Sequence, residues 1–170
     1  LKIKKQEYIS CVFFGDGAVE EGVFYESINF ALVHKLPVLF ICENNQYSVY
    51  SPMHVRQPNK RKIYKLSEKI GVESLYCNGN DIDKIYKSFE MATNYIRKFR
   101  KPFFIEFSNY RWREHCGPNY DDNLNYRNKK LTKSMIRRDI LVKLENYLKK
   151  NLRDGEKIIK RLKDSNLKKI

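Results

Sequence analysis

The sequence lacks the cysteine patterns and long apolar runs that mark secreted, zinc-binding and membrane-spanning proteins. Its cysteines lie more than 30 residues apart, so no C-x-x-C motif or Cys/His zinc spacing occurs; they are Cys11, Cys42, Cys77 and Cys116. No apolar run approaches the roughly 18–20 residues that span a membrane. The apolar run that follows the basic amino-terminal residues is also too short for the core of a signal peptide. We therefore expect free thiols in a reducing compartment, and a cytoplasmic location.

Internal repeats and low-complexity tracts are also missing, and the composition is that of a globular protein. Of the 170 residues, 42% are hydrophobic and 14% are aromatic. This is enough for one α/β domain with a buried core. The chain begins at Leu1 and soon enters an apolar run, so we expect that an amino-terminal portion precedes it.

The net charge of +14 is distributed unevenly along the chain. Residues 128–170 carry 15 Lys and Arg against 5 Asp and Glu, which leaves only about +4 on the first 127 residues. Nucleic-acid binding is not favoured, because charge is its only support and no platform of alternating aromatic and basic residues accompanies it. The basic tail is either a solvated pair of helices or a segment that docks on an acidic partner.

The first part of the sequence predicts a βαβ unit. Residues 9–14 (ISCVFF) and 36–44 (LPVLFICEN) are short apolar runs of the kind found in buried parallel strands. Between them, a helix is predicted from about Val19 to His34, with one apolar stripe formed by Val23, Phe24, Ile28, Ala31 and Leu32. A right-handed crossover would make the two strands parallel neighbours.

The rest of the sequence continues the alternation of strands and helices. Residues 46–62 and 113–127 have loop composition, and the residues after 127 are predicted to be helical. The remaining expected elements are a helix at 63–72 closed by Gly71, a strand at 73–77, a turn at 78–81, a helix at 82–99 with Ile82, Ile85, Phe89, Ala92 and Ile96 on one face, and a strand at 102–112. This order predicts an open, mostly parallel sheet with helices on both faces, followed by a basic helical extension.

Polar residues follow two neighbouring strands of this predicted sheet. Gly15-Asp16-Gly17 ends the first strand, and residues 43–47 (ENNQY) end the second. Ligands bind at the carboxyl ends of the strands in open α/β sheets. Asp16 and one of Asn44 and Asn45 would supply oxygen ligands for Mg²⁺, the glycines would let a phosphate approach, and a helix that starts after Gly17 would point its N–H groups at that anion.

These residues form a pattern that resembles the thiamine diphosphate signature, GDG followed by 26 residues and then NN. The surrounding segment, GDGAVEEGVFYESINFALVHKLPVLFICENNQYSV, resembles the alpha subunit of the decarboxylating component of 2-oxo acid dehydrogenases, as in pyruvate, branched-chain and acetoin dehydrogenases. NGND at 78–81, PFFIEFSNYR at 102–111 and REHCGP at 113–118 match it further. The resemblance covers roughly residues 8–127.

The resemblance implies a thiamine-diphosphate-binding fold over residues 1–127, incomplete at its amino terminus, with residues 128–170 packing on it or extending it. By the same resemblance, Asp16, the side-chain oxygen of Asn45 and the backbone carbonyl of Tyr47 would bind Mg²⁺. Gly15, Gly17 and Ala18 would line the diphosphate. His115 would lie near the reacting carbon of the cofactor, with Arg111 and Arg113 beside it.

The activity implied is oxidative decarboxylation of a 2-oxo acid, or reaction of a related acyl or acetoin substrate, with acyl transfer to a lipoyl group. The implied partners are a beta subunit in an α₂β₂ assembly, or a fused beta domain, and a lipoyl-bearing acyltransferase. In this family the glutamate that activates the cofactor comes from the beta part, so the chain alone is expected to be inactive. The alternative function is a catalytically incomplete remnant that serves as a subunit-interaction module.

Several residues near the predicted site also have simpler interpretations. Glu20 and Glu21 are expected to be first-turn acids of the helix that follows, favoured there by the helix dipole. Glu26 is either solvated or in contact with a partner subunit. His115 and Cys116 are either site residues or ordinary loop residues, because the segment after His115 departs from the family pattern.

Overall fold

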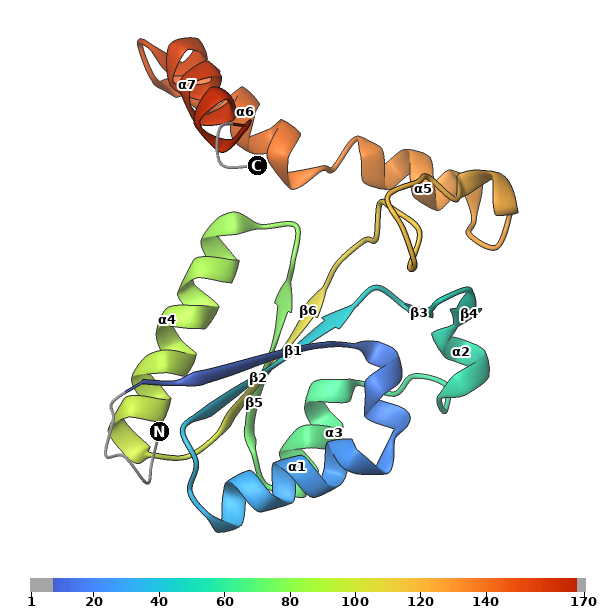
Figure 1. Ribbon diagram of the computed structural model, residues 1–170, viewed down its shortest axis with the longest axis vertical. Helices are drawn as coiled ribbons and strands as arrows, with labels where there is room; N and C mark the ends of the chain where they lie inside the picture. The colour runs from blue at the N-terminus through green and yellow to red at the C-terminus, as the bar shows by residue number, and fades with distance from the viewer. Residues whose placement is uncertain (1–7, 168–170) are drawn as a thin grey trace. The chain divides into compact units, whose positions relative to one another are not determined.

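The computed structural model describes residues 8–167, apart from the side chains of Lys129 and Leu131 (Figure 1). The described residues form two compact units, one that ends at Tyr126 and one that begins at Arg127. The first unit contains the sheet and both predicted turns of the site, and the second is helical.

The sheet of the first unit is fully parallel, with the strand order β1-β2-β6-β5. Its strands are β1 (Ser10–Gly15), β2 (Val38–Asn44), β5 (Glu73–Asn78) and β6 (Phe103–Ser108). Every strand pair is separated along the chain by at least one helix, as parallel crossovers require. The predicted open parallel sheet is therefore confirmed, although β6 ends at Ser108 and not at residue 112.

Helices cover both faces of this sheet (Figure 1). On one face, α1 (Gly22–Val33) and α3 (Ile63–Ile70) pack against alternate residues of the central strands, among them Phe40 and Phe104. On the other face, α4 (Ile82–Phe99) packs against the residues between them, such as Ile41 and Ile105. The central strands read as continuous apolar runs because both of their faces are buried in this way.

The prediction that the first strand is buried is wrong for the described chain. Strand β1 lies at the edge of the sheet, and Val12 and Phe13 are 44% and 59% exposed. Its sequence has the same apolar character as β2, but β2 has a strand on each side and β1 has a described neighbour on one side only. Burial of an apolar strand depends on its neighbours, which the composition of the strand does not report.

The segment after β1 forms two short elements where one helix was predicted. A 3₁₀ helix, η1 (Asp16–Glu20), follows the strand directly, and α1 begins only at Gly22. The buried stripe of α1 is also narrower than predicted: Phe24, Ile28 and Ala31 are buried, whereas Val23 is 64% exposed.

Two helix boundaries agree with the sequence signals. Helix α3 ends at Gly71, which adopts a left-handed conformation with φ of 110° that glycine tolerates best. Helix α4 begins after Asp81, whose side chain accepts a hydrogen bond from the backbone N–H of Lys84. The predicted face of α4 is correct except at Ile82, which is 48% exposed.

The segment at 46–62, predicted to be a loop, contains ordered elements. Strands β3 (Tyr47–Ser48) and β4 (Ser51–Pro52) pair in an antiparallel hairpin, and the short helix α2 (Met53–Arg56) follows at once. Met53 is buried against the core on the α1 face of the sheet. This segment therefore brings α2 to the end of the sheet at which η1 lies.

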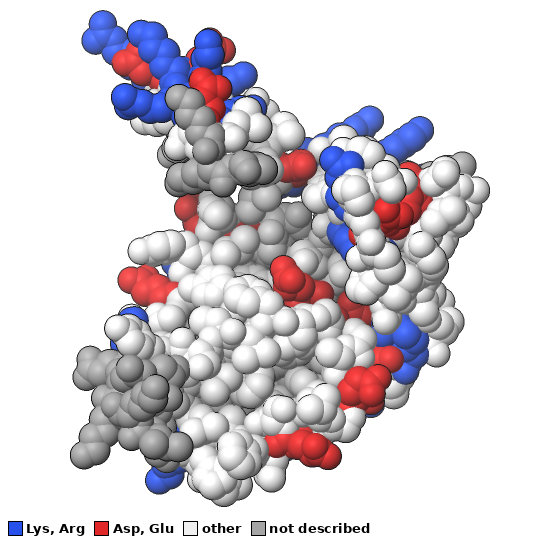
Figure 2. All heavy atoms as spheres, viewed as in Figure 1, with Lys and Arg blue, Asp and Glu red and all other residues white. Residues whose placement is uncertain are grey.

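The second unit consists of α5 (Lys129–Ile136), α6 (Ile140–Asn151) and α7 (Gly155–Leu167). The predicted helical segment is interrupted between α5 and α6, where Asp139 caps α6 by accepting from the N–H of Leu141. Glu145 and Lys163 form an ion pair of 2.7 Å between α6 and α7. Lysine and arginine side chains gather over α6 and α7 (Figure 2). Among residues 8–167, we find no helix with the length and apolar character of a membrane span.

Candidate functional site

The carboxyl ends of β1, β2 and β6 lie together at one edge of the sheet. Gly15, the last residue of β1, is opposite Glu43 of β2, and Asn44 ends β2 beside the end of β6. Asp16 follows β1 directly, and Asn45 follows β2. The strand register therefore brings the two predicted site segments to the same edge of the sheet.

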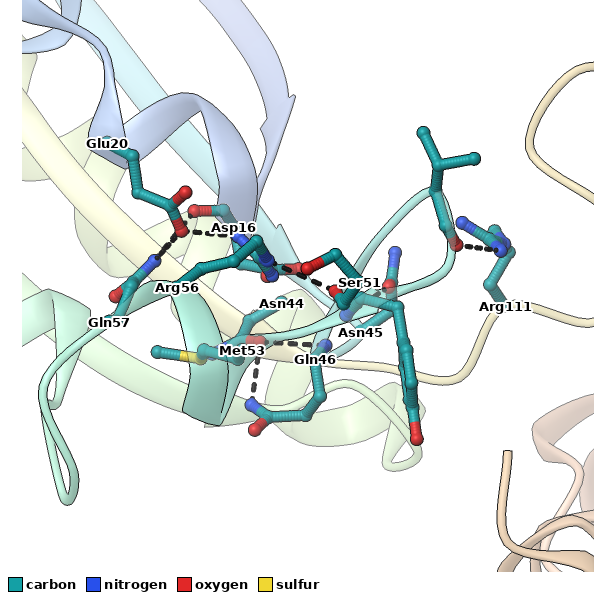
Figure 3. Close-up of polar contacts among 12 residues, drawn as sticks. Asp16, Glu20, Asn44, Asn45, Gln46, Ser51, Met53, Arg56, Gln57 and Arg111 are labelled. Atoms are coloured by element: carbon teal, nitrogen blue, oxygen red, sulfur yellow. Dashed lines mark hydrogen bonds and ion pairs between the residues drawn. The ribbon is translucent and has the colours of Figure 1, made fainter. Parts of the chain in front are cut away.

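Asp16 is fully buried and belongs to a cluster of polar side chains from η1 and α2 (Figure 3). Its Oδ2 accepts a hydrogen bond of 2.5 Å from Nη2 of Arg56, and Nη1 of Arg56 pairs with Oε1 of Glu20. Nε2 of Gln57 donates to the same Glu20 oxygen at 2.8 Å and to the backbone carbonyl of Asp16 at 3.1 Å. One guanidinium group thus joins the two carboxylates of η1.

Two oxygens of this cluster, Oδ1 of Asp16 and Oε1 of Gln57, are buried without a hydrogen-bond donor among the described residues. A buried acceptor without a partner costs about 1–3 kcal/mol, and a cation beside it would remove that cost. Carboxylate and amide oxygens are also the ligands that Mg²⁺ prefers. The open oxygen of Asp16 therefore fits the magnesium-ligand role that the sequence predicts for this residue.

Asn44 is buried beneath the site, and both polar atoms of its side chain already have hydrogen-bond partners, so it is not a candidate metal ligand. Its Nδ2 donates to Oε1 of Glu106 at 2.7 Å, and its Oδ1 accepts from the backbone N–H and the side-chain amide of Gln46. The other carboxylate oxygen of Glu106 accepts from the backbone N–H of Tyr64 at 2.9 Å. These bonds tie the end of β2 to β6 and to the start of α3.

Asn45 and Tyr47 lie in the turn that follows β2 and are less buried than Asn44. Oδ1 of Asn45 accepts a hydrogen bond of 3.0 Å from the backbone N–H of Tyr47, which closes the turn. An amide oxygen has a second lone pair, so this bond leaves Asn45 able to bind a cation. Tyr47 is paired with Pro52, which has no N–H and cannot donate to the carbonyl of Tyr47.

The glycines of the first turn have different surroundings. A Cβ on Gly17 would lie 2.8 Å from Oγ of Ser48, so the absence of a side chain lets η1 approach β3 closely. A Cβ on Gly15 would meet no atom within 4 Å, so open space lies beside that residue. The side chain of Ala18 lines an apolar recess together with Val12 and Phe14.

Burial at this edge also affects Cys42 of β2, which is fully buried. Burial, and secondly the nearby carboxylates of Glu106, Asp16 and Glu43, raise the pKa of this thiol far above its usual range. The thiol is therefore protonated and unreactive at neutral pH, and it takes no part in chemistry at the site.

His115 lies on a different kind of segment, an exposed turn after β6. Glu114 closes this turn: its backbone N–H donates to the carbonyl of Asn119, and its Oε1 accepts from the side-chain amide of Asn119 at 2.9 Å. His115 forms no hydrogen bond or ion pair with another described residue. The structure therefore does not join His115 to Asp16 or Asn45 by a direct contact.

The two arginines beside His115 are held by the protein itself. Nη2 of Arg111 donates to the carbonyl of Val49 and to Oη of Tyr126, both at 2.8 Å. The guanidinium of Arg113 lies 3.8 Å from the centre of the Tyr120 ring and donates to the carbonyl of Pro118. Both arginines therefore stabilise the loop itself in the described conformation.

Two sequence predictions about the first turn are wrong. First, the α-helix does not start after Gly17: residues Asp16–Glu20 form a 3₁₀ helix, and α1 begins only at Gly22. Glu20 and Glu21 are not first-turn acids of α1, because Glu20 ends η1 and pairs with Arg56, while Glu21 occupies the capping position without a capping side-chain bond. The helix dipole therefore does not explain Glu20.

Arg56, Gln57 and Glu106 are site residues that the sequence did not reveal. Arg56 and Gln57 come from a segment with loop composition, 36 and 37 residues from their partner Glu20. Glu106 carried a usable signal, since it is a single carboxylate inside the apolar strand FFIEF. A charged residue within a buried strand needs partners, and Asn44 and Tyr64 provide them.

Comparisons with known proteins show which proteins the chain is similar to. Pyruvate dehydrogenase E1 component subunit alpha of Rickettsia bellii is 32% identical over 157 residues, which are 92% of this chain and 47% of the relative. The 2-oxoisovalerate dehydrogenase subunit alpha of Bacillus subtilis is 33% identical over 87% of this chain and 44% of its own length. The chain thus spans about half the length of these relatives.

A solved structure and a family model extend the comparison. Transketolase from Campylobacter jejuni matches with a TM-score of 0.50 and 27% identity, over 59% of this chain and 15% of that one. The model of the Dehydrogenase E1 component family matches residues 1–170. Because that match runs through the whole sequence, the chain belongs to the dehydrogenase E1 component family.

Proposed function

We propose that the chain is the magnesium- and diphosphate-binding part of the alpha subunit of a thiamine-diphosphate-dependent 2-oxo acid dehydrogenase. The observation that carries the proposal is the buried Oδ1 of Asp16, which has no donor among the described residues and lies at the carboxyl ends of the parallel strands. Family membership and the names of the relatives, pyruvate and 2-oxoisovalerate dehydrogenase alpha subunits, support the same function.

Asp16, the side-chain oxygen of Asn45 and the backbone carbonyl of Tyr47 would hold Mg²⁺. The open space beside Gly15 and the close approach of η1 and β3 at Gly17 support diphosphate binding at this turn. Ala18 would contribute through its backbone, since its side chain lines the apolar recess. The thiazolium ring of bound thiamine diphosphate would supply the electron sink for loss of CO₂ from a 2-oxo acid.

The chain's own residues would bind and orient the cofactor. A fully buried Asp16 fixes one metal ligand in a low-dielectric place, where its attraction to a cation is stronger than in water. When the acyl group is transferred to a lipoyl disulfide and the S–S bond breaks, His115 would donate a proton to the sulfur that leaves. Its turn is exposed in this chain, so a second surface would have to cover His115 and exclude water from the reaction.

A beta subunit, in an α₂β₂ assembly or as a fused domain, is the partner that we propose for this surface. A lipoyl-bearing acyltransferase would then receive the acyl group, and the assembly would be cytoplasmic. The basic second unit, with lysines and arginines over α6 and α7, is a further surface available to an acidic partner (Figure 2).

Calorimetry with Mg²⁺ and thiamine diphosphate tests the site directly. We expect Asp16→Asn to weaken binding by at least about 10–100-fold, because that range applies to residues that only orient a metal ligand, and Asp16 would be a ligand itself. Asp83→Asn is the matched control, because Asp83 is an exposed acid in the first turn of α4, and it should bind like the wild type. Equal binding by the wild type and Asp16→Asn would show that Asp16 is not a metal ligand.

A decarboxylation assay tests the assignment of the chain to one half of an enzyme. Mixed with a matching beta chain and a 2-oxo acid, the alpha subunit should release CO₂, and the isolated 170 residues should not. Full activity of the isolated chain would refute the requirement for a beta part.

A further inference from the structure

Arg56 is the only residue in the described part of the chain that forms ion pairs with both Asp16 and Glu20. All three of its guanidinium nitrogens are engaged: Nη2 with Asp16, Nη1 with Glu20, and Nε with the carbonyl of Ser51 at 3.1 Å. The side chain is only 12% exposed. This geometry fixes a positive charge against a residue that the proposed function assigns to a metal ion.

The two partners of Arg56 differ in ways that matter for exchange. The side chain of Asp16 is fully buried and has one open oxygen, whereas that of Glu20 is 27% exposed and holds Arg56 and Gln57 through a single oxygen. The unpaired Oδ1 is therefore the oxygen of Asp16 that remains for a cation. Arg56 can then leave Oδ2 and remain attached to Glu20 and Ser51.

We infer that Arg56 is a placeholder cation: its guanidinium occupies the position next to Asp16 until a metal ion binds there. This inference rests on the proposed function of Asp16. Without metal, its guanidinium neutralises Asp16 and keeps the buried carboxylate in position. A buried carboxylate without any partner would be strongly unfavourable. When a divalent cation binds, the guanidinium leaves Asp16 and stays paired with Glu20, so the Arg56–Glu20 pair sets the affinity of the site for metal.

Binding of Mn²⁺ alone to the full chain, followed by the electron paramagnetic resonance signal of free Mn²⁺, tests this role. The titration is run in about 0.5 M salt, where the Debye length of about 4 Å screens charges that do not touch the site. Arg56→Gln should bind Mn²⁺ about tenfold more tightly, because a directly competing charge is removed. Lys62→Gln, which removes an exposed positive charge from the same segment, should bind within about twofold of the wild type.

Glu20→Gln gives the opposite sign and a coupling test. Loss of the Glu20 carboxylate removes the ion pair that would hold Arg56 once it leaves Asp16, so otherwise wild-type protein with this substitution should bind Mn²⁺ more weakly. In the Arg56→Gln background the same substitution should have almost no effect, because no guanidinium remains to be moved. Additive effects of the two substitutions would mean that they act through charge alone, and would overturn the placeholder role.

The outcomes separate this inference from the proposed function. If Asp16→Asn binds Mn²⁺ as the wild type does, the metal site itself is wrong. If Asp16→Asn loses binding but Arg56→Gln binds no more tightly than the wild type, only the placeholder role is wrong. Should Arg56→Gln be unfolded without metal, millimolar Mn²⁺ should restore its far-ultraviolet circular dichroism and should not restore that of the double variant with Asp16→Asn. Failure of Mn²⁺ to restore the fold would also overturn the inference.

Discussion

The segment around Asp16 and the turn around His115, both predicted to hold site residues, differ sharply in how the protein supports them. Around Asp16, Arg56 of α2 and the adjoining Gln57 bond to Asp16 and Glu20 of η1, over 36 to 41 residues of sequence. Around His115, the bonds that close the turn join residues five apart, such as Glu114 and Asn119. The first segment is fixed by tertiary contacts, whereas the turn at His115 is closed by local ones, and Arg111 ties only the start of its loop to the distant Val49.

This difference suggests a division of labour within the proposed site. The chain itself builds the part that would bind metal and diphosphate, because buried polar groups must find partners when the chain folds. It leaves the part that would meet the substrate exposed, so that a partner surface can complete it. Three experiments test whether the two segments are as different as their contacts indicate.

The largest effect is expected at Glu106, which has a close counterpart at Glu114. Each carboxylate accepts from one asparagine side chain and one backbone N–H: Glu106 from Asn44 and Tyr64, and Glu114 from Asn119 twice. Glu106→Leu leaves two donors without partners in the buried edge of the sheet, so it should lower the free energy of unfolding by about 3 kcal/mol. Urea unfolding measures this loss.

Glu114→Leu is the matched control for that measurement. Its donors lie in an exposed turn, where water can replace the lost carboxylate, so the cost should stay below about 1 kcal/mol. Similar losses for the two variants would show that the His115 turn is as firmly built as the Asp16 cluster.

The contrast also shows which features a sequence can predict. The bounds of α4 and the end of α3 followed from local signals, since Asp81 caps one helix and Gly71 ends the other. The partners of Glu20 could not be predicted from local signals, because Arg56 and Gln57 come from a distant segment whose composition indicates only a loop. The exposure of β1 was missed for the same reason, because it depends on which strands lie beside it.

Some of the missed features did carry a signal. Glu106 is a lone acid in an apolar strand, and Asp139 is an N-cap residue that interrupts the apolar stripe between α5 and α6. Both follow from the rules that buried charges need partners and that aspartate favours helix starts. In contrast, the polar strand ends predict Asp16 as a metal ligand, and its unpaired Oδ1 fits that role. The choice of Asn45 over Asn44, and the carbonyl of Tyr47, rest on the resemblance alone.

An intermediate effect is expected from the pH dependence of stability, through Cys42. Burial raises the pKa of this thiol in the folded state far above its value of about 8.5 in the unfolded chain. The folded state therefore keeps its proton where the unfolded state loses it. The stabilising contribution is complete below about pH 8.5 and falls by up to about 1.4 kcal/mol for each pH unit above it.

Unfolding of the wild type, Cys42→Ala and Cys116→Ala between about pH 8 and 9.5 measures this contribution. Cys42→Ala should lose stability less steeply with pH than the wild type, whatever its stability at pH 8. Cys116→Ala should keep the wild-type slope, because Cys116 is exposed in the second segment. Equal slopes for all three proteins would mean that the thiol at the Asp16 edge is not protected by burial.

The smallest effect on the protein itself is expected at His115. Its side chain is exposed and bonds to no described residue, so His115→Ala should change the free energy of unfolding by less than about 0.5 kcal/mol. Mg²⁺ binding should also stay within about twofold of the wild type, because no contact links His115 to Asp16. With a beta chain present, the same variant should lose 2-oxo acid decarboxylation, since His115 is assigned to the reacting group. A tenfold change in Mg²⁺ affinity would instead mean that the two segments are energetically coupled. In that case the chain would not build the metal-binding segment independently of the segment that a partner covers.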